Sequence, residues 1–163
     1  MNTSEIIFTE IEGIFFRAIN PVFRQYALSG SQAAGRYSSS AQPTLYLSSS
    51  REGVDAAMQS HKTNRSSTLD VLRVHVVANK IIDLRNSFAL AEIGVSIEDA
   101  LAPWQEIVAR GATPRSWAVR DRLVACGANG LIDPSRKAPG LWHLVLFSWN
   151  KNDAPQVHVV DET

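Results

Sequence analysis

The sequence predicts an α+β fold, in which one compact domain over residues 1–163 combines a mixed sheet with helices packed outside it. Short segments rich in β-branched and aromatic residues recur along the chain, as strands require. Segments with helical spacing lie between them in the second half. The length of 163 residues, with 45% hydrophobic and 20% charged residues, is ordinary for a single globular domain.

The first part of the chain is predicted to form two strands around a loop. Residues 14–19 are apolar and aromatic around Arg17, which favours a strand. Residues 29–43 are rich in Ser, Gly, Ala and Gln, and we expect a loop of small residues there. Residues 44–48 (TLYLS) follow Pro43, a boundary residue, and are predicted to form a short strand.

A helix and two further strands are expected next. Ser49 or Ser50 can cap a helix that runs on to His61. Residues 72–84 contain a β-branched run, VLRVHVV, followed by Ala-Asn-Lys and then IIDL. We therefore expect two strands in this segment, separated by a turn or bulge at residues 78–80.

Helical spacing then dominates. Residues 88–93 and 97–108 are predicted to be helical, with Pro103 near a helix start or break. Residues 113–126 begin with Thr-Pro, a capping hydroxyl followed by proline at the first helical position, and Gly127 is the natural stop.

The last strands are expected at residues 131–132 and 141–149, with an edge strand at 157–160. Between the first two of these lies a loop, residues 133–140, that contains Pro, Ser, Arg, Lys and Gly.

Charge and composition limit the classes of function. Sixteen basic and sixteen acidic residues leave no net charge, which argues against direct binding to the backbone of nucleic acids. The single cysteine, Cys126, allows no internal disulfide, and a reducing cytoplasm is the simplest location. We expect no secretion signal, no membrane partner and no metal site, because the sequence lacks long apolar runs and clustered Cys and His ligands.

Four polar residues stand out by their context, each with an ordinary alternative. Arg36 lies among small residues, where its guanidinium could hold a phosphate or carboxylate or simply be solvated. Tyr46 is a site candidate or a core tyrosine with its hydroxyl at the rim. His61 can complement a helix dipole, and Ser135 can stabilise a turn. The residues alone do not decide among these alternatives.

The order of several motifs resembles the RES family, named for an Arg, a Glu and a Ser. The resemblance covers residues 15–147 approximately. Its motifs, in chain order, are FFRAI, ALSG, AAGRYSS with Tyr37 in place of Trp, TLYLSSS, His61, KIIDL and GANGLIDPSRKAPGLWHLVLF. Each motif is weakly specific, whereas their shared order is much more so.

One position departs from the family pattern. The family glutamate lies four residues before the histidine, and that position is Ala57 in this chain. Glu52 and Asp55 are the nearby acids, and neither lies one or two helical turns from position 57. Glu52 is therefore the leading replacement, with a simple role in the first helical turn as the alternative.

The resemblance implies a fold similar to the ADP-ribosyltransferase toxins and an enzyme that consumes NAD+ as its substrate. It implies catalytic roles for Arg36, Tyr46, Ser135 and, as the replacement acid, Glu52. Dinucleotide-binding roles are implied for a wider set of residues, namely Arg17, Arg36, Tyr37, Tyr46, Ser48, His61 and Ser135.

The resemblance also implies a bacterial toxin paired with an Xre-type helix-turn-helix antitoxin. Because Ala57 removes a carboxylate that would activate water, we favour transfer of ADP-ribose to a protein acceptor, as in a branch that modifies a protein of nucleotide metabolism. The alternatives are an NAD+ glycohydrolase or phosphorylase and a catalytically inactive NAD-binding module. A nucleic-acid-cleaving toxin is disfavoured by the neutral net charge.

Overall fold

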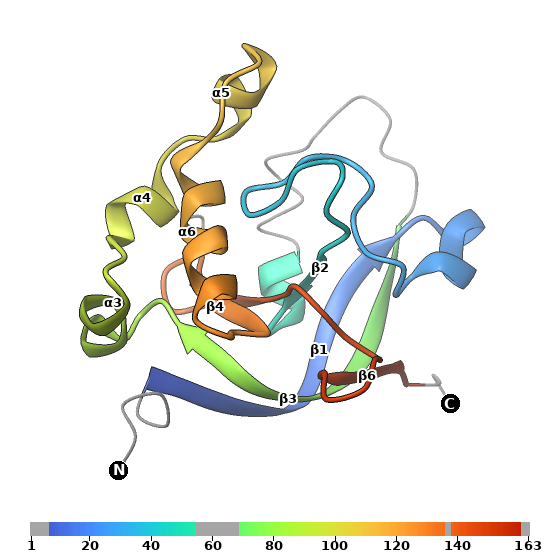
Figure 1. Ribbon diagram of the computed structural model, residues 1–163. Helices are drawn as coiled ribbons and strands as arrows, with labels where there is room; N and C mark the ends of the chain where they lie inside the picture. The colour runs from blue at the N-terminus through green and yellow to red at the C-terminus, as the bar shows by residue number, and fades with distance from the viewer. Residues whose placement is uncertain (1–6, 55–68, 136–137, 161–163) are drawn as a thin grey trace.

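The computed structural model describes residues 7–54, 69–135 and 138–160, and in this part of the chain a mixed sheet curls round on itself (Figure 1). The strand order is β1-β2-β5-β4-β3-β6, and β1 also pairs with β3, so that five of the strands close a ring. The β3–β4 pair is parallel and the other pairs are antiparallel. The predicted α+β class with a mixed sheet and outer helices is confirmed.

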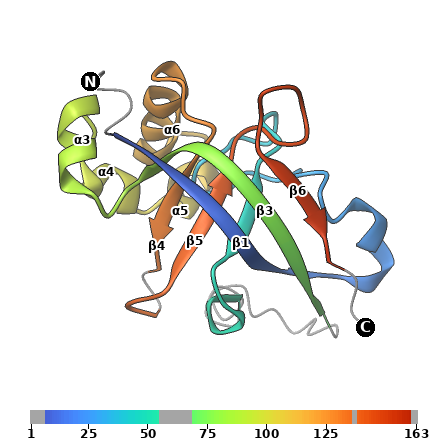
Figure 2. The same ribbon diagram turned by 90° about the horizontal axis from the view of Figure 1, so that it is seen from below.

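The six strands of this sheet are β1 (Phe8–Ile19), β2 (Leu45–Ser48), β3 (Asp70–Asp83), β4 (Gly130–Pro134), β5 (Trp142–Leu146) and β6 (Gln156–Val159). The first and third are long and strongly bent, and they cross below the shorter strands (Figure 2). Strand β6 pairs only with β3 and forms the predicted edge.

Alternation along the strands creates an inner and an outer apolar layer. Leu45 and Leu47 of β2 point into the ring and are fully buried there, together with Leu144 and Leu146 of β5. Burying each of these leucines stabilises the fold by about 1.5–3 kcal/mol. Tyr46 lies between the two β2 leucines, so it faces outward with Ser48, into the layer under the helices.

The helices α3 (Ser87–Ile93), α4 (Ile97–Leu101), α5 (Gln105–Ala109) and α6 (Arg115–Ala125) follow β3, and α3, α4 and α6 cover the outer layer (Figure 2). The predicted helix over 97–108 is divided into α4 and α5, because Pro103 lies in the interval and cannot continue a helix. Pro114 is the N-cap of α6 rather than its first helical residue. Gly127 has a φ of 90° and ends α6 as predicted.

Two strands are longer and more regular than the sequence suggested. β1 begins at Phe8 because residues 8–13 also pair along β3, with a shift of register between Thr9 and Ile11. The segment expected as two strands is the single strand β3, in which a bulge near Lys80 (φ 57°) takes up the irregularity. The bulge alternative was therefore right, and the turn alternative was wrong.

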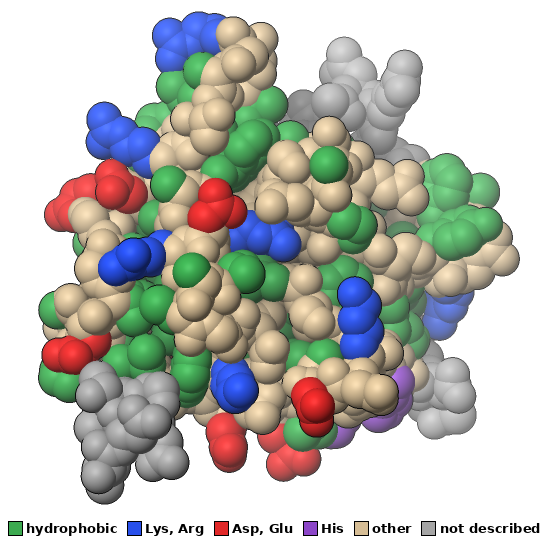
Figure 3. Space-filling view, in the orientation of Figure 1, with side chains coloured by type: hydrophobic (Ala, Val, Ile, Leu, Met, Phe, Trp, Pro, Cys, Tyr) green, Lys and Arg blue, Asp and Glu red, His purple; other side chains and the backbone are tan. Residues whose placement is uncertain are grey.

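Smaller differences occur at the ends of elements. β4 includes Asp133 and Pro134, which were expected in a loop, and β5 ends at Leu146 because the chain bends at residues 147–148. A 3₁₀ helix, η1 (Pro21–Tyr26), was not predicted, and it carries exposed hydrophobic side chains that gather at one end of the molecule (Figure 3).

The helix expected after β2 begins where predicted. The Ser50 hydroxyl accepts a hydrogen bond from the Gly53 amide at 3.0 Å, and residues 51–54 are helical. Ala57 and His61 lie outside the described residues. Within the described ranges, no helix is long and apolar enough to cross a membrane.

Candidate functional site

A tight turn of the small-residue loop lies directly on Tyr46. Gly35 and Ser38 bridge each other, with the Gly35 amide donating to the Ser38 carbonyl at 2.8 Å. The Tyr46 hydroxyl accepts a hydrogen bond from the Tyr37 amide at 3.1 Å and hydrogen-bonds with the Ser38 hydroxyl at 2.7 Å. A Cβ on Gly35 would lie 2.6 Å from that hydroxyl, so glycine is needed for this approach.

Helix α6 holds the same turn from its other side. The Trp117 indole donates to the Gly35 carbonyl at 2.9 Å, the Ser116 hydroxyl donates to the next carbonyl along the turn, and Arg120 donates to the Tyr37 carbonyl at 2.9 Å. Three consecutive carbonyls of an irregular loop thus have side-chain partners, as buried backbone requires. The turn is therefore fixed between β2 and α6.

Arg120 makes the charged contact among these, and it was not among the residues singled out from the sequence. Its guanidinium is buried, donates to the Thr44 hydroxyl at 2.7 Å, and lies 4.8 Å from the centre of the Phe147 ring. Burial lowers its pKa, although the arginine stays charged. An arginine on the buried stripe of a helix, in step with Ser116, Val119 and Leu123, was the available signal.

The Tyr46 phenol is neutral and serves as a hydrogen-bonding group. Burial raises the pKa of Tyr46 above its usual value of 10.0, and this outweighs the hydrogen bonds from Ser38 and Tyr37 and the charge of Arg120, which all lower it. The phenol is thus protonated at neutral pH. The alternative of a core tyrosine with its hydroxyl at the rim is close to the observed position. The ring packs on the outer layer, and the hydroxyl contacts the loop.

Arg36 is held against the end of α4. Its Nη1 donates to the carbonyls of Ala100 at 3.1 Å and Ala102 at 2.7 Å. The side chain is half-buried, so the alternative of a freely solvated arginine does not describe it. A guanidinium oriented by fixed carbonyls is suited to two-point recognition of an anion.

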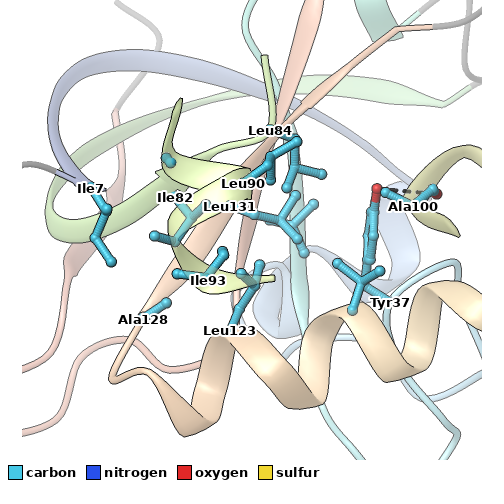
Figure 4. Close-up of a cluster of buried hydrophobic side chains, with 13 residues drawn as sticks. Ile7, Tyr37, Ile82, Leu84, Leu90, Ile93, Ala100, Leu123, Ala128 and Leu131 are labelled. Carbon is cyan, nitrogen blue, oxygen red and sulfur yellow. Dashed lines mark hydrogen bonds between the residues drawn. The ribbon is translucent and has the colours of Figure 1, made fainter. Parts of the chain in front are cut away.

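Tyr37 connects the turn to strand β4. Its ring is fully buried in the outer layer, and its hydroxyl donates to the Asp133 carboxylate at 2.8 Å. The same hydroxyl reaches the Ala100 carbonyl at 3.5 Å (Figure 4). Asp133 is itself buried, at 6% exposure, so this hydrogen bond satisfies a carboxylate that would be costly to leave unpaired.

Ser48 and His143 form a further pair on this face. They lie opposite each other in the β2–β5 register, and the Ser48 hydroxyl is 3.0 Å from His143 Nδ1. On the other side of His143, Asp133 is directly opposite in the β4–β5 register. Ser48 was predicted from the sequence, whereas His143 and Asp133 were not, because a polar residue within an apolar strand is a weak signal.

Arg17 and Ser135 approach from different directions. Arg17 lies on β1, where its Nη1 donates to the Tyr46 carbonyl at 3.2 Å, its Nε is buried without a hydrogen-bond partner, and burial lowers its pKa. The Ser135 hydroxyl accepts from the Ala138 amide at 3.1 Å, which is the turn-stabilising role considered as its alternative. Ser135 follows directly after the end of β4, two residues beyond Asp133.

The predicted residues therefore differ in how directly they meet. Tyr37, Tyr46 and Ser48 share one face, and Arg36, next to Tyr37, reaches the end of α4. Arg17 touches the β2 backbone, and Ser135 lies in the adjoining loop. Glu52 is exposed in the first turn of its helix, and the next residue, Gly53, is the one that packs against Ser48 and His143. His61 lies outside the described residues.

No group of three or more metal-ligating side chains occurs among the described residues. A cleft of about 850 Å³ lies elsewhere, lined by β1, β3 and the segment before β6, and a second one of about 340 Å³ lies along β1 beside Ser49 and Trp142. Neither cleft is lined by a predicted site residue, so we define the candidate site by its hydrogen-bonded residues.

Comparison with known proteins agrees with the fold. The sequence model of the protein family described as the RES domain matches residues 14–163 of this chain. The chain is similar in structure to a chain of the M. tuberculosis MbcT–MbcA toxin–antitoxin complex, with a TM-score of 0.60 and 14% sequence identity, over 96% of this chain and 89% of that one. No curated protein matches the sequence significantly.

Proposed function

The chain belongs to the RES domain family, and from that premise we propose that it breaks the nicotinamide–ribose bond of NAD+ and transfers ADP-ribose to a protein acceptor. The observation that carries this proposal is the turn over Tyr46, which contains Arg36 and brings the Ser38 hydroxyl onto a neutral phenol, with Ser48 two residues further along β2. These groups suit a ligand with a diphosphate and a sugar.

We assign the diphosphate to Arg36. Its orientation is set before binding by the carbonyls of Ala100 and Ala102, which reduces the entropy lost when it grips an anion. Arg17 is the second cation that we assign to the diphosphate. Its contact with the Tyr46 carbonyl also helps to position strand β2.

We assign the nicotinamide ribose to Tyr46, Ser48 and Ser135. Departure of nicotinamide leaves positive charge on the ribose, and a preorganised polar face stabilises that charge. The neutral Tyr46 phenol can stack on or hydrogen-bond the sugar, and the Ser135 hydroxyl keeps a proton to donate while accepting from Ala138. Tyr37 supports this face through Asp133, and His61 is assigned an orienting role.

The reaction also needs a group that accepts the ADP-ribose. The C1′–N bond breaks, its electron pair neutralises the nicotinamide ring, and an acceptor atom bonds to C1′ and loses its proton. Glu52 is exposed rather than packed against the face, and a poorly placed carboxylate slows hydrolysis more than binding. This favours a protein that supplies its own nucleophile.

Incubation with NAD+ labelled in its adenylate, with and without cell extract, tests the acceptor. A labelled protein band supports transfer. Free ADP-ribose or ADP-ribose phosphate without a band would instead establish the second candidate, an NAD+ glycohydrolase or phosphorylase. An inactive binding module would give neither product while still binding NAD+ in a calorimeter.

We propose that the protein acts as a toxin with an Xre-type helix-turn-helix antitoxin as its partner. The structural similarity to a chain of a toxin–antitoxin complex supports this idea. Expression of the chain alone should arrest growth, and Arg36→Ala should relieve the arrest. Co-expression of a small helix-turn-helix protein from the adjacent reading frame should also relieve it and should yield a complex on gel filtration.

Cleavage of nucleic acid is the least supported alternative. The chain has no net charge, and basic and acidic side chains are interspersed on the face seen in Figure 3 rather than gathered in a basic stripe. Degraded RNA in arrested cells, with NAD+ at its normal level, would contradict our proposal.

A further inference from the structure

His143 was not among the residues suggested by the sequence, yet it lies at the centre of a polar row on the candidate site. The row crosses three adjacent strands, with Ser48 on β2, His143 on β5 and Asp133 on β4 at directly paired positions. The distance from the Ser48 hydroxyl to His143 Nδ1 is 3.0 Å. This arrangement hydrogen-bonds a hydroxyl to an imidazole and places a carboxylate on the neighbouring strand, at the position paired with that imidazole.

The row lies next to the residue assigned to the ribose. Ser48 and Tyr46 are two residues apart on one strand and face the same side, so they are about 7 Å apart along β2. The Tyr37 hydroxyl donates to Asp133 while its amide donates to the Tyr46 hydroxyl, so Tyr37 supports both the row and Tyr46. A sugar bound at Tyr46 would therefore lie within reach of Ser48.

The other candidate proton acceptors in the described site are less suitable. The Tyr46 phenol has a raised pKa and stays neutral. Glu52 is exposed on its helix. Asp133 is buried and already accepts from Tyr37, which suits a carboxylate that stabilises a nearby positive charge. An imidazole is the side chain whose basicity matches proton transfer near neutral pH.

We propose that Ser48 and His143 are the proton-accepting pair of this site, an inference that rests on the proposed NAD+ activity. As the acceptor atom bonds to C1′ and the C1′–N bond breaks, the acceptor's proton passes to the Ser48 oxygen. The Ser48 proton passes at the same time to His143 Nδ1, and the imidazolium, opposite Asp133, later releases it to water. Nicotinamide leaves with the electron pair of the broken bond.

The start of the following helix encloses the pair. A Cβ on Gly53 would lie 3.3 Å from the Ser48 Cβ and 3.7 Å from His143 Cε1, so the chain passes close over both side chains. Ser48 is only 6% exposed. A shielded hydroxyl exchanges its proton with the imidazole rather than with bulk water, which is what a relay needs.

The decisive variant is His143→Asn, because the asparagine Oδ1 can accept the Ser48 hydrogen bond in place of Nδ1 but is not a base. We expect kcat for NAD+ consumption to fall about 100-fold or more while KM changes little. Free imidazole should restore part of the turnover of His143→Ala. The matched control is His75→Asn, on β3, whose ring instead contacts His158 and whose loss should leave turnover unchanged.

Ser48→Ala gives an independent measurement should the asparagine variant fold poorly. Its kcat should fall to a similar extent, and the Ser48→Ala/His143→Asn double variant should be no slower than the slower single variant, because a relay fails as a unit. An His143→Asn enzyme that turns over within about threefold of the wild type overturns the inference, as does a lack of imidazole rescue. A wild-type protein that neither binds nor consumes NAD+ overturns the proposed function itself, and this inference with it.

Discussion

Replacing Gly35 by alanine tests whether the turn over Tyr46 is as close as the structure has it. The new Cβ would lie 2.6 Å from the Tyr46 hydroxyl, 3.0 Å from Tyr46 Cζ and 3.2 Å from the Ser38 hydroxyl. The φ of Gly35 is not positive, so the backbone itself accepts alanine. Any destabilisation by Gly35→Ala therefore reports the side-chain clash.

Two effects of opposite sign decide the magnitude. Alanine restricts the unfolded chain and, without a clash, would stabilise the protein by about 0.4–1 kcal/mol. Forcing an extra carbon into a packed site costs about 1–3 kcal/mol. Because three heavy atoms lie within 3.2 Å and two belong to a ring fixed by hydrogen bonds, we expect the clash to win. The net loss should be about 1–2 kcal/mol, or roughly 2–8 °C in Tm.

Urea unfolding of Gly35→Ala, Tyr46→Phe and the double variant measures this coupling. Tyr46→Phe alone removes the hydroxyl that accepts the Tyr37 amide, at a cost of about 1–3 kcal/mol. It also removes the atom nearest to the new Cβ. The double variant should therefore lose at least about 1 kcal/mol less of its free energy of unfolding than the two single variants lose together. Additive losses, or a Gly35→Ala protein more stable than wild type, would refute the close approach.

Three further predictions concern charged and titrating groups. Arg120→Met should lower the free energy of unfolding, measured by urea titration, by about 2–4 kcal/mol because two buried charged hydrogen bonds are lost. The control is Arg115→Met on the same helix. It loses only an exposed ion pair and should change that free energy by less than about 1 kcal/mol. Burial raises the pKa of the Asp83 carboxyl, but the hydrogen bonds and charge of Arg85 outweigh this and hold it below its usual value. The folded state thus binds that proton less tightly than the unfolded state, so stability falls as the pH drops through the acid range, and Asp83→Asn should flatten this acid limb; an unchanged limb would count against the pair. The raised pKa of Tyr46, caused mainly by burial, means that its stabilisation is lost as the pH rises above 10. One of the phenols that titrate above pH 10 in ultraviolet absorbance should therefore be missing in Tyr46→Phe.

The elements that the sequence predicted correctly are those with strong local signals. The strand over 44–48 combines β-propensity with a preceding proline, and the stop of α6 needs a glycine at positive φ. β1 was predicted too short because Glu10 and Glu12 interrupt its apolar residues, although a strand with one exposed face tolerates them. The division of the sheet into inner and outer layers follows from pairing across the ring, which no local signal reports.

The site was only partly predictable for the same reason. Arg36, Tyr37, Tyr46 and Ser48 lie within thirteen residues of one another, in a loop and the strand that follows it, and were found together. Arg120 and His143 meet them across 83 and 95 residues of sequence. Their roles depend on α6 and β5 packing over the same face, so they became visible only in the folded chain.

The turn at residues 35–38 is closed by backbone hydrogen bonds between Gly35 and Ser38, but its other backbone groups must find partners elsewhere. Those partners come from β2, which supplies the Tyr46 hydroxyl, and from α6, which supplies Trp117, Ser116 and Arg120. Neither element alone can fix the turn, because each reaches a different side of it. Arg36 and Tyr37 therefore take up their positions only when the sheet and α6 have packed together, and the contacts that complete the fold are the same contacts that orient the groups assigned to the diphosphate. Arg120 accordingly belongs to the site through the loop that it holds, whether or not it ever touches a ligand.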